Sequence, residues 1–339
     1  MKLDTALVSR DLRTIPAAAQ AAEEVGFDGL WTLETGDDPY LPLVMAAEHT
    51  TRVAIGTAIA VAFPRSPMVT AQIAWDLAAL SRGRFILGLG TQVKGHNERR
   101  YSVKWEAPVP RLREYVESLR AIFKCWAAGG NQLAYQGKFY NFSLMTPFFT
   151  PAPHEFSDIP IYLAGVNEKI CQLAGELCQG LHAHPFHSPK YLREFVLPNL
   201  EIGLAKSGRT RQDFSIASIA FVITGKSRAE IDRMREEVRR QIAFYASTRT
   251  YRVVLDTHGW GEVATRLSQR AAKGDWDGMA AEISDEMVET YSVSGRFDEI
   301  GDKVRARYEG LLDRIAFYMP YRAGIDDDAW RRLNYTFNR

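Results

Sequence analysis

Three histidines near the middle of the chain have a spacing that would let them contact one ligand. His182 and His184 stand two residues apart at the end of a short apolar run, and His187 follows them. Alternate residues of a β-strand point to the same face, so the first two imidazoles would share a cavity if this run is a strand. No companion Asp, His or Cys stands at ligand spacing elsewhere in the sequence, which favours contact with a cofactor or substrate over a metal site.

A glycine turn offers a second kind of chemistry. Gly165, Val166 and Asn167 lie between an apolar run, 161–164, and a segment with helical periodicity, 168–177. Backbone N–H groups at the start of a helix are free, and the helix dipole favours negative charge there, so this turn could bind a phosphate. The alternative is an ordinary strand-to-helix turn that Asn167 caps.

Other familiar motifs are incomplete. Gly88 and Gly90 follow a strand pattern, but position 93 is Val where a dinucleotide fingerprint needs its third glycine. That pair is therefore consistent with a tight strand exit. The sequence contains no Gly-x-Ser-x-Gly, so a nucleophile for acyl transfer is not indicated.

Composition limits the partners. The 339 residues include 42 Lys and Arg against 41 Asp and Glu, a net charge of +1. Such a balance provides no overall field for nucleic acid or an anionic membrane, and a small-molecule substrate is the expected partner. Three cysteines cannot all pair, and the N-terminal residues have no signal-peptide core, so we expect a cytoplasmic enzyme.

The elements that must position these residues alternate between strand and helix. Eight apolar runs read as strands: 3–8, 27–33, 53–60, 84–89, 161–164, 181–184, 215–224 and 314–319. The helical segments between them include 15–25, 39–50, 68–80, 111–127, 168–177, 189–206 and 228–245. This α/β order predicts a TIM barrel, a (β/α)8 fold, with a doubly wound sheet as the alternative.

Two longer segments interrupt the alternation. Residues 132–157, after the fourth strand, are aromatic and aperiodic and are expected to contain a hairpin at 135–142. Residues 260–288, after the seventh strand, are helical and charged. We expect both to be insertions in a single domain that spans residues 1–339.

Residues 56–101, GTAIAVAFPRSPMVTAQIAWDLAALSRGRFILGLGTQVKGHNERRY, resemble the core of the bacterial luciferase-like flavin and deazaflavin oxidoreductases. The resemblance extends to residues 23–43, 161–186 and 297–319 and is strongest to the branch that uses coenzyme F420. It implies a TIM barrel with a deazaflavin in its mouth and hydride transfer at the deazaflavin C5.

The resemblance also implies site residues. A bulge at Thr57, Ala58 and Ile59 would back the deazaflavin ring, with a non-prolyl cis peptide between Ala58 and Ile59. The phosphate would bind at the Gly165–Asn167 turn. Further cofactor contacts are implied at Thr35, Gly90, Thr91, Gln92 and Asn97.

One departure concerns proton transfer. Relatives that oxidise a sugar phosphate carry an Asp-His pair where this chain has Glu34 and Thr35. Glu34, His182 and His184 are therefore the candidate acid/base residues.

These features predict an F420-dependent oxidoreductase acting on a small organic molecule. The alternatives are an FMN-dependent luciferase-like monooxygenase and a barrel that binds its cofactor without catalysis. We expect a homodimer or a higher homo-oligomer. The aromatic segment 139–149, with Trp105, would form a lid or a wall of the pocket, or the dimer interface.

Overall fold

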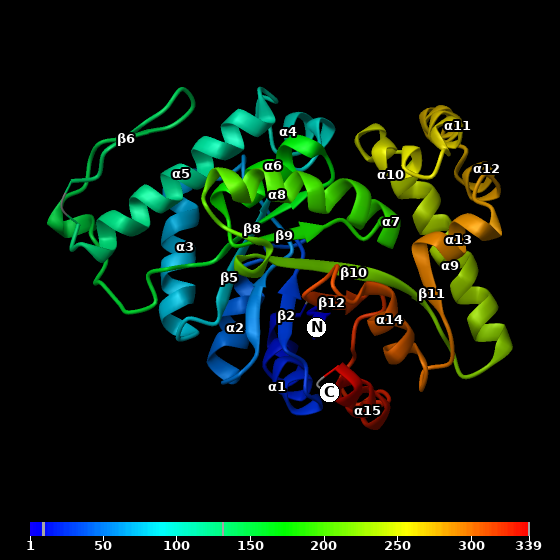
Figure 1. The fold of residues 1–339 in the computed structure, drawn as a ribbon. Helices are drawn as coiled ribbons and strands as arrows, with labels where there is room; N and C mark the ends of the chain where they lie inside the picture. Colours follow the sequence, from blue (N-terminus) through cyan, green and yellow to red (C-terminus); the bar gives the residue numbers. More distant parts are fainter. Residues whose placement is uncertain (9–10, 131, 338–339) are drawn as a thin grey trace.

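Eight parallel strands close into a barrel (Figure 1). The computed structural model describes residues 1–8, 11–130 and 132–337. The barrel strands are β1 (Lys2–Ala6), β2 (Gly29–Thr32), β3 (Ala54–Thr57), β5 (Phe85–Gly90), β8 (Ile161–Gly165), β9 (Gly180–Ala183), β10 (Ser215–Ile223) and β12 (Arg314–Phe317). Because β10 pairs with both β9 and β12, these eight strands form a closed ring. The predicted TIM barrel is confirmed, and the doubly wound alternative is excluded.

The third strand is shorter than predicted. The expected run 53–60 is divided into β3 and a two-residue strand, β4 (Ala60–Val61), which pairs with β5. Between them the backbone turns away from the barrel path at Ala58–Ile59, where the structure has the predicted cis peptide bond.

Helices cover the outside of the barrel. They include α1 (Ile15–Val25), α2 (Leu41–His49), α3 (Pro67–Leu80), α6 (Glu168–Leu177), α8 (Leu197–Lys206), α9 (Arg228–Ala246), α14 (Ile300–Tyr308) and α15 (Asp327–Phe337). Local sequence sets their ends: the Ser66 hydroxyl accepts a hydrogen bond from the Met68 N–H and caps α3, while Gly26, at φ 109°, ends α1. The expected helix 189–206 is interrupted by a π-helical turn at Leu192–Val196. Among the described helices, none is both long and apolar enough to cross a bilayer.

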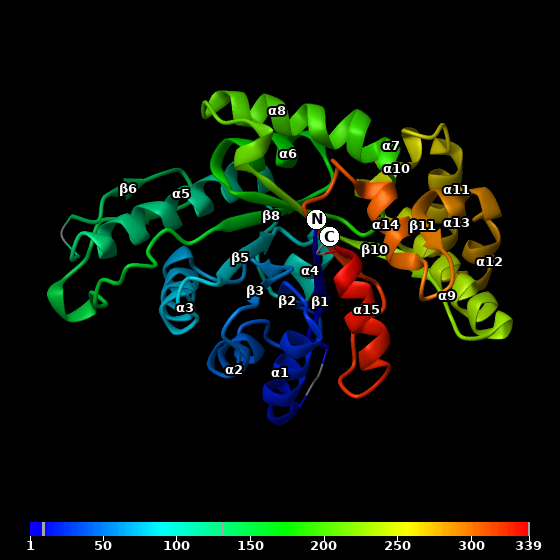
Figure 2. The ribbon, with the colours of Figure 1, turned by 60° about the horizontal axis from the view of Figure 1, so that its bottom comes forward.

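The first predicted insertion, 132–157, follows α4 (Lys94–Arg99) and α5 (Pro108–Ala127). It contains the predicted hairpin of β6 (Tyr135–Gln136) and β7 (Asn141–Phe142), which extends away from the barrel (Figures 1 and 2). The Glu114 carboxylate accepts hydrogen bonds from the N–H groups of residues 138–140 and ties the hairpin to α5.

The second insertion is a cluster of short helices on the opposite side (Figure 2). It includes α10 (Arg252–Asp256), and the expected helical segment 260–288 forms α11 (Gly261–Ala272), α12 (Trp276–Ala281) and α13 (Asp285–Tyr291). A left-handed glycine, Gly274 at φ 71°, separates α11 from α12, and Ser284 caps α13. A short strand, β11 (Ser292–Ser294), then extends the sheet beyond β10.

A buried ion pair joins the first and last barrel strands. The Arg314 guanidinium donates from Nε and Nη2 to both Asp4 carboxylate oxygens, at 2.8 and 2.7 Å, and the Trp31 indole N–H donates to Asp4 at 2.8 Å. Burial opposes the charge on Arg314, but the Asp4 carboxylate outweighs it and raises the pKa of the guanidinium. Gly29 leaves the necessary space, because a Cβ there would lie 2.3 Å from Arg314 Nη2.

Removing one charge of this pair should destabilise the fold. Asp4→Asn leaves the Arg314 guanidinium buried without a counter-charge, which costs about 3–5 kcal/mol in comparable sites. Urea unfolding should show that loss. The matched control is Asp298→Asn, which breaks an exposed pair with Arg296. An Asp4→Asn variant as stable as this control would show that the ion pair does not support the barrel.

Candidate functional site

One cavity of about 800 Å³ opens at the carboxyl ends of the barrel strands. Most of the predicted site residues line it: Ala58, Ile59, Gly90, Thr91, Gln92, Gly165, Val166, Asn167, His182 and His184. Glu34, Thr35, Thr57 and Asn97 do not. Because active sites of TIM barrels lie at this end of the strands, the cavity is the candidate active site.

The bulge at Ala58–Ile59 forms one wall of the cavity. Thr57 lies behind it, where its hydroxyl donates to the Gly88 carbonyl at 2.6 Å and accepts from the Gly88 N–H at 2.9 Å. Gly90 completes the wall, since a Cβ there would lie 2.8 Å from Ile59 Cδ1. Thr57 thus fixes β3 against β5, and the bulge itself faces the cavity.

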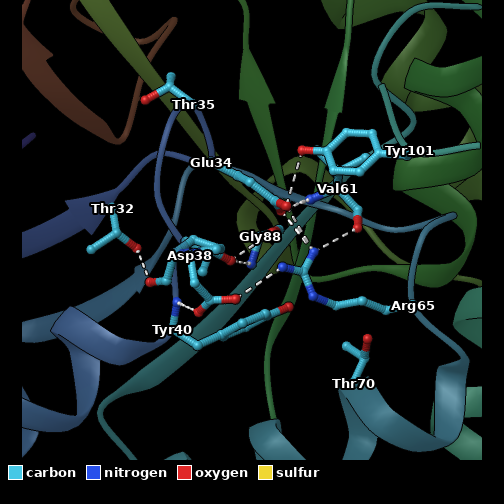
Figure 3. A network of polar contacts seen from close by, with 12 residues as sticks. Thr32, Glu34, Thr35, Asp38, Tyr40, Val61, Arg65, Thr70, Gly88 and Tyr101 are labelled. Carbon is cyan, nitrogen blue, oxygen red and sulfur yellow. Dashed lines mark hydrogen bonds and ion pairs between the residues drawn. The ribbon is translucent and has the colours of Figure 1, made fainter. Parts of the chain in front are cut away.

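Glu34 does not line the cavity but contacts the chain at the same bulge. Figure 3 shows its carboxylate between Val61, Arg65 and Tyr101. Its carboxylate accepts hydrogen bonds from the Val61 N–H at 2.6 Å, from Arg65 at 2.8 Å and from the Tyr101 hydroxyl at 3.2 Å. The Glu34 N–H donates to the Ile59 carbonyl at 3.3 Å. With its side chain 6% exposed and both oxygens engaged, Glu34 is placed to hold the bulge.

The loop after β5 is held by Asn97. Its side-chain amide donates to the carbonyls of Thr91 and Val93 at 2.8 and 3.1 Å. Gln92 turns through φ 57° and lines the cavity with Thr91. Thr35 is exposed, and its carbonyl accepts a hydrogen bond from Arg100. Asn97 and Thr35 therefore contact the loops around the cavity and not its interior.

The Gly165 turn presents free donors. Asn167 makes no side-chain cap to α6, and within the described chain the N–H groups of Glu168 and Lys169 have no acceptor. The Tyr191 hydroxyl fixes the turn by donating to the Val166 carbonyl. Glycine is required at 165 because a Cβ would lie 2.3 Å from Ile170 Cγ2. Donors, helix dipole and the nearby Lys169 together suit an anionic group.

The two histidines are neutral hydrogen-bonding groups at neutral pH. His182 packs edge-on against Trp31, with the ring centroids 4.9 Å apart. Burial and then the charge of Arg314 lower the pKa of His182 to about 3, against a smaller opposing effect of the Thr57 backbone. Burial also lowers the pKa of His184, as does its neighbour His187. Both imidazoles are therefore uncharged at pH 7, and each keeps a hydrogen on one ring nitrogen.

His187, the third histidine of the predicted group, does not line the cavity. It is buried, and its Nδ1 lies 2.9 Å from the His184 carbonyl. Across the described part of the chain, no three His, Cys, Asp or Glu side chains gather as metal ligands.

The expected aromatic lid is absent from the cavity lining in the described structure. Trp105 lines the cavity, but residues 139–149 do not. The hairpin is tied along α5 by Glu114, and Phe148 and Phe149 are 89% and 73% exposed. The dimer interface remains a prediction for this segment.

Other side chains do line the cavity without having been predicted: Asp4, Trp31, Phe195, Tyr245 and Tyr251.

Comparison with known proteins gives the family. Residues 2–314 match the family model described as luciferase-like monooxygenase. An uncharacterized protein of Mycobacterium tuberculosis is 44% identical over 93% of this chain and 92% of its own length. The 5,10-methylenetetrahydromethanopterin reductase of Archaeoglobus fulgidus is 30% identical over 84% of this chain and 82% of its own length. The coenzyme F420 dependent tetrahydromethanopterin reductase from Methanopyrus kandleri shares the fold, with a TM-score of 0.77 and 21% identity. The match covers 98% of this chain and 97% of that one.

The buried histidines predict a pH-dependent stability. A histidine with a lowered pKa in the folded state, such as His182, binds protons mainly in the unfolded state below pH 6.5. The free energy of unfolding should therefore fall as pH drops from about 6.5 toward 3, by up to ~1.4 kcal/mol per pH unit for this histidine. Urea unfolding from pH 7 to pH 4 should show a flatter dependence for His182→Gln. His96→Gln, at an exposed position, should keep the wild-type slope. Equal slopes for His182→Gln and wild type would contradict the assignment.

Proposed function

We propose, from the premise that this chain belongs to the luciferase-like monooxygenase family, that it is an F420-dependent oxidoreductase. It transfers a hydride between C5 of the deazaflavin and a small organic substrate. The observation that carries the proposal is the convergence of the bulge, the Gly90 loop and the Gly165 turn on one cavity. The relative from Archaeoglobus fulgidus, 30% identical over most of both chains, supports the choice of cofactor class.

The residues present fit such a cofactor. The free N–H groups at the start of α6 would hold its phosphate, and the ammonium groups of Lys169 and of Lys94, which lies 3.9 Å from the Glu98 carboxylate, would hold its acidic tail. The bulge at Ala58–Ile59 would back its ring. When bound, F420 supplies the carbon that gives or accepts the hydride.

The chain's own residues then orient the reactants and exclude water. His182 and His184 would act as neutral hydrogen-bonding groups, since burial lowers the pKa of both. Glu34 would act as a positioning residue, because its carboxylate is already bound to Arg65 and to the Val61 N–H. In this proposal the proton that accompanies the hydride comes from solvent or from the substrate.

Cofactor choice tests the proposal directly. We expect F420 to bind at least tenfold more tightly than FMN, a difference of ~1.4 kcal/mol that one or two charge-assisted contacts would provide. Absorbance titration of the purified protein with each cofactor measures it. Lys169→Ala should weaken F420 binding, whereas Lys124→Ala, on the outer helix α5, should not. Equal or reversed affinities would favour the FMN-dependent monooxygenase.

Glu34→Gln distinguishes positioning from acid/base catalysis. The amide keeps the side-chain shape but loses the ion pair with Arg65, so the bulge should loosen and F420 affinity should fall about three- to tenfold. The pH profile of turnover should keep its wild-type form. Asp38→Asn is the matched control, because Asp38 also binds Arg65, at 3.1 Å, but has no hydrogen bond to the bulge among the described contacts. A Glu34→Gln variant that loses one limb of the pH profile would restore Glu34 as the acid/base.

A further inference from the structure

The cavity has two chemically different sides. Its charged lining residues other than Asp4, which pairs with Arg314, are Lys94, Glu168 and Lys169, at the starts of α4 and α6. From residue 171 onward, none of the described lining residues carries a charge, since the two histidines are neutral. This second side includes four rings, which we call the aromatic wall: His184, Phe195, Tyr245 and Tyr251.

The aromatic wall holds His184 in one orientation. The Tyr245 ring lies 4.6 Å from the imidazole at an interplanar angle of 87°, and the Tyr251 ring lies 4.3 Å from it. Tyr245 is itself fixed, because its hydroxyl lies 2.7 Å from that of Tyr318. The half-buried imidazole therefore has little freedom to rotate.

The hydrogen bond to His184 determines its tautomer. The Phe186 N–H donates to His184 Nδ1 at 3.1 Å, so Nδ1 must carry a lone pair. A neutral imidazole then has its hydrogen on Nε2, and Nε2 has no partner among the described residues. The aromatic wall thus presents one N–H donor surrounded by apolar ring surface.

We propose that the aromatic wall binds a neutral substrate with an apolar body and a carbonyl or hydroxyl oxygen, and that His184 Nε2–H donates a hydrogen bond to that oxygen. The proposal rests on the proposed function in one respect, that the cationic side is taken by the cofactor. A carboxylate or phosphate on the substrate would lie against the aromatic wall without a counter-charge, and its desolvation would not be compensated. His184 is here a specificity-determining residue.

Binding of three probes of similar size tests the substrate class. Acetophenone is a neutral aryl ketone, whereas benzoate and phenyl phosphate carry a negative charge on the same ring. With the F420-loaded protein, calorimetric titration should give acetophenone an affinity at least tenfold higher than that of either anion. If either anion binds as tightly as acetophenone, the proposal is overturned. F420 titration without a probe reports on the proposed function separately, so a protein that binds F420 but prefers the anions would refute only the substrate class.

Two measurements test the role of His184. His184→Phe keeps an aromatic ring but removes the donor, and it should weaken acetophenone binding about tenfold while F420 affinity is unchanged. The matched control is His154→Phe, because His154 Nδ1 accepts from the Phe156 N–H at 3.2 Å in the same local turn and lies against Trp75, outside the cavity. Unchanged acetophenone binding in His184→Phe would overturn the assignment.

The wild-type protein gives a test that does not depend on folding of the variant. Nitrogen-15 NMR should show the His184 hydrogen on Nε2, with a resonance that shifts when acetophenone is added. A hydrogen on Nδ1, or an unperturbed resonance at saturating acetophenone, would refute the proposed contact.

Discussion

The ion pair between Asp4 and Arg314 is the constraint from which the interior of this barrel is built. A closed barrel needs its first and last strands to meet, and here the meeting point of β1 and β12 carries the buried Asp4–Arg314 ion pair. Asp4 also accepts from Trp31, whose ring packs against His182, so one carboxylate orders the floor of the cavity across β1, β2, β9 and β12. The charge of Arg314 adds to burial in keeping His182 unprotonated.

Internal pairing of charges also decides what the cavity can bind. Asp4 is used by Arg314 and Glu34 by Arg65, so these two carboxylates are not available as free bases. Lys94 and Lys169, at the starts of α4 and α6, bring positive charge to the cavity beside Glu168, while His184 after β9 and Tyr245 of α9 contribute neutral rings. In the proposed function, the anionic cofactor would bind near the lysines and an apolar substrate near these rings.

Much of this arrangement could be predicted from the sequence, because it depends on local pattern. Apolar runs gave the eight strands, and the resemblance in residues 56–101 gave the cis peptide at Ala58–Ile59. The ion pair of Glu34 could not be predicted in the same way, since its partner Arg65 lies 31 residues away and spacing alone does not bring them together. Helix α15 was missed although Trp330, Leu333 and Phe337 are spaced for one buried face.

The two histidines show how the surroundings of an imidazole bear on its acid/base chemistry. A His-x-His pair at a strand end suggests proton transfer because a free imidazole titrates near pH 6.5. In this fold each ring is packed among aromatic residues, and the uncharged form is favoured because burial lowers the pKa of both imidazoles. The neutral His184 still has a defined donor direction, because the Phe186 N–H donates to Nδ1 and leaves the ring hydrogen on Nε2. Hydride transfer needs its two carbon centres held in one orientation in a dry space, and a rigid neutral donor provides that orientation without adding a charge that would have to be solvated.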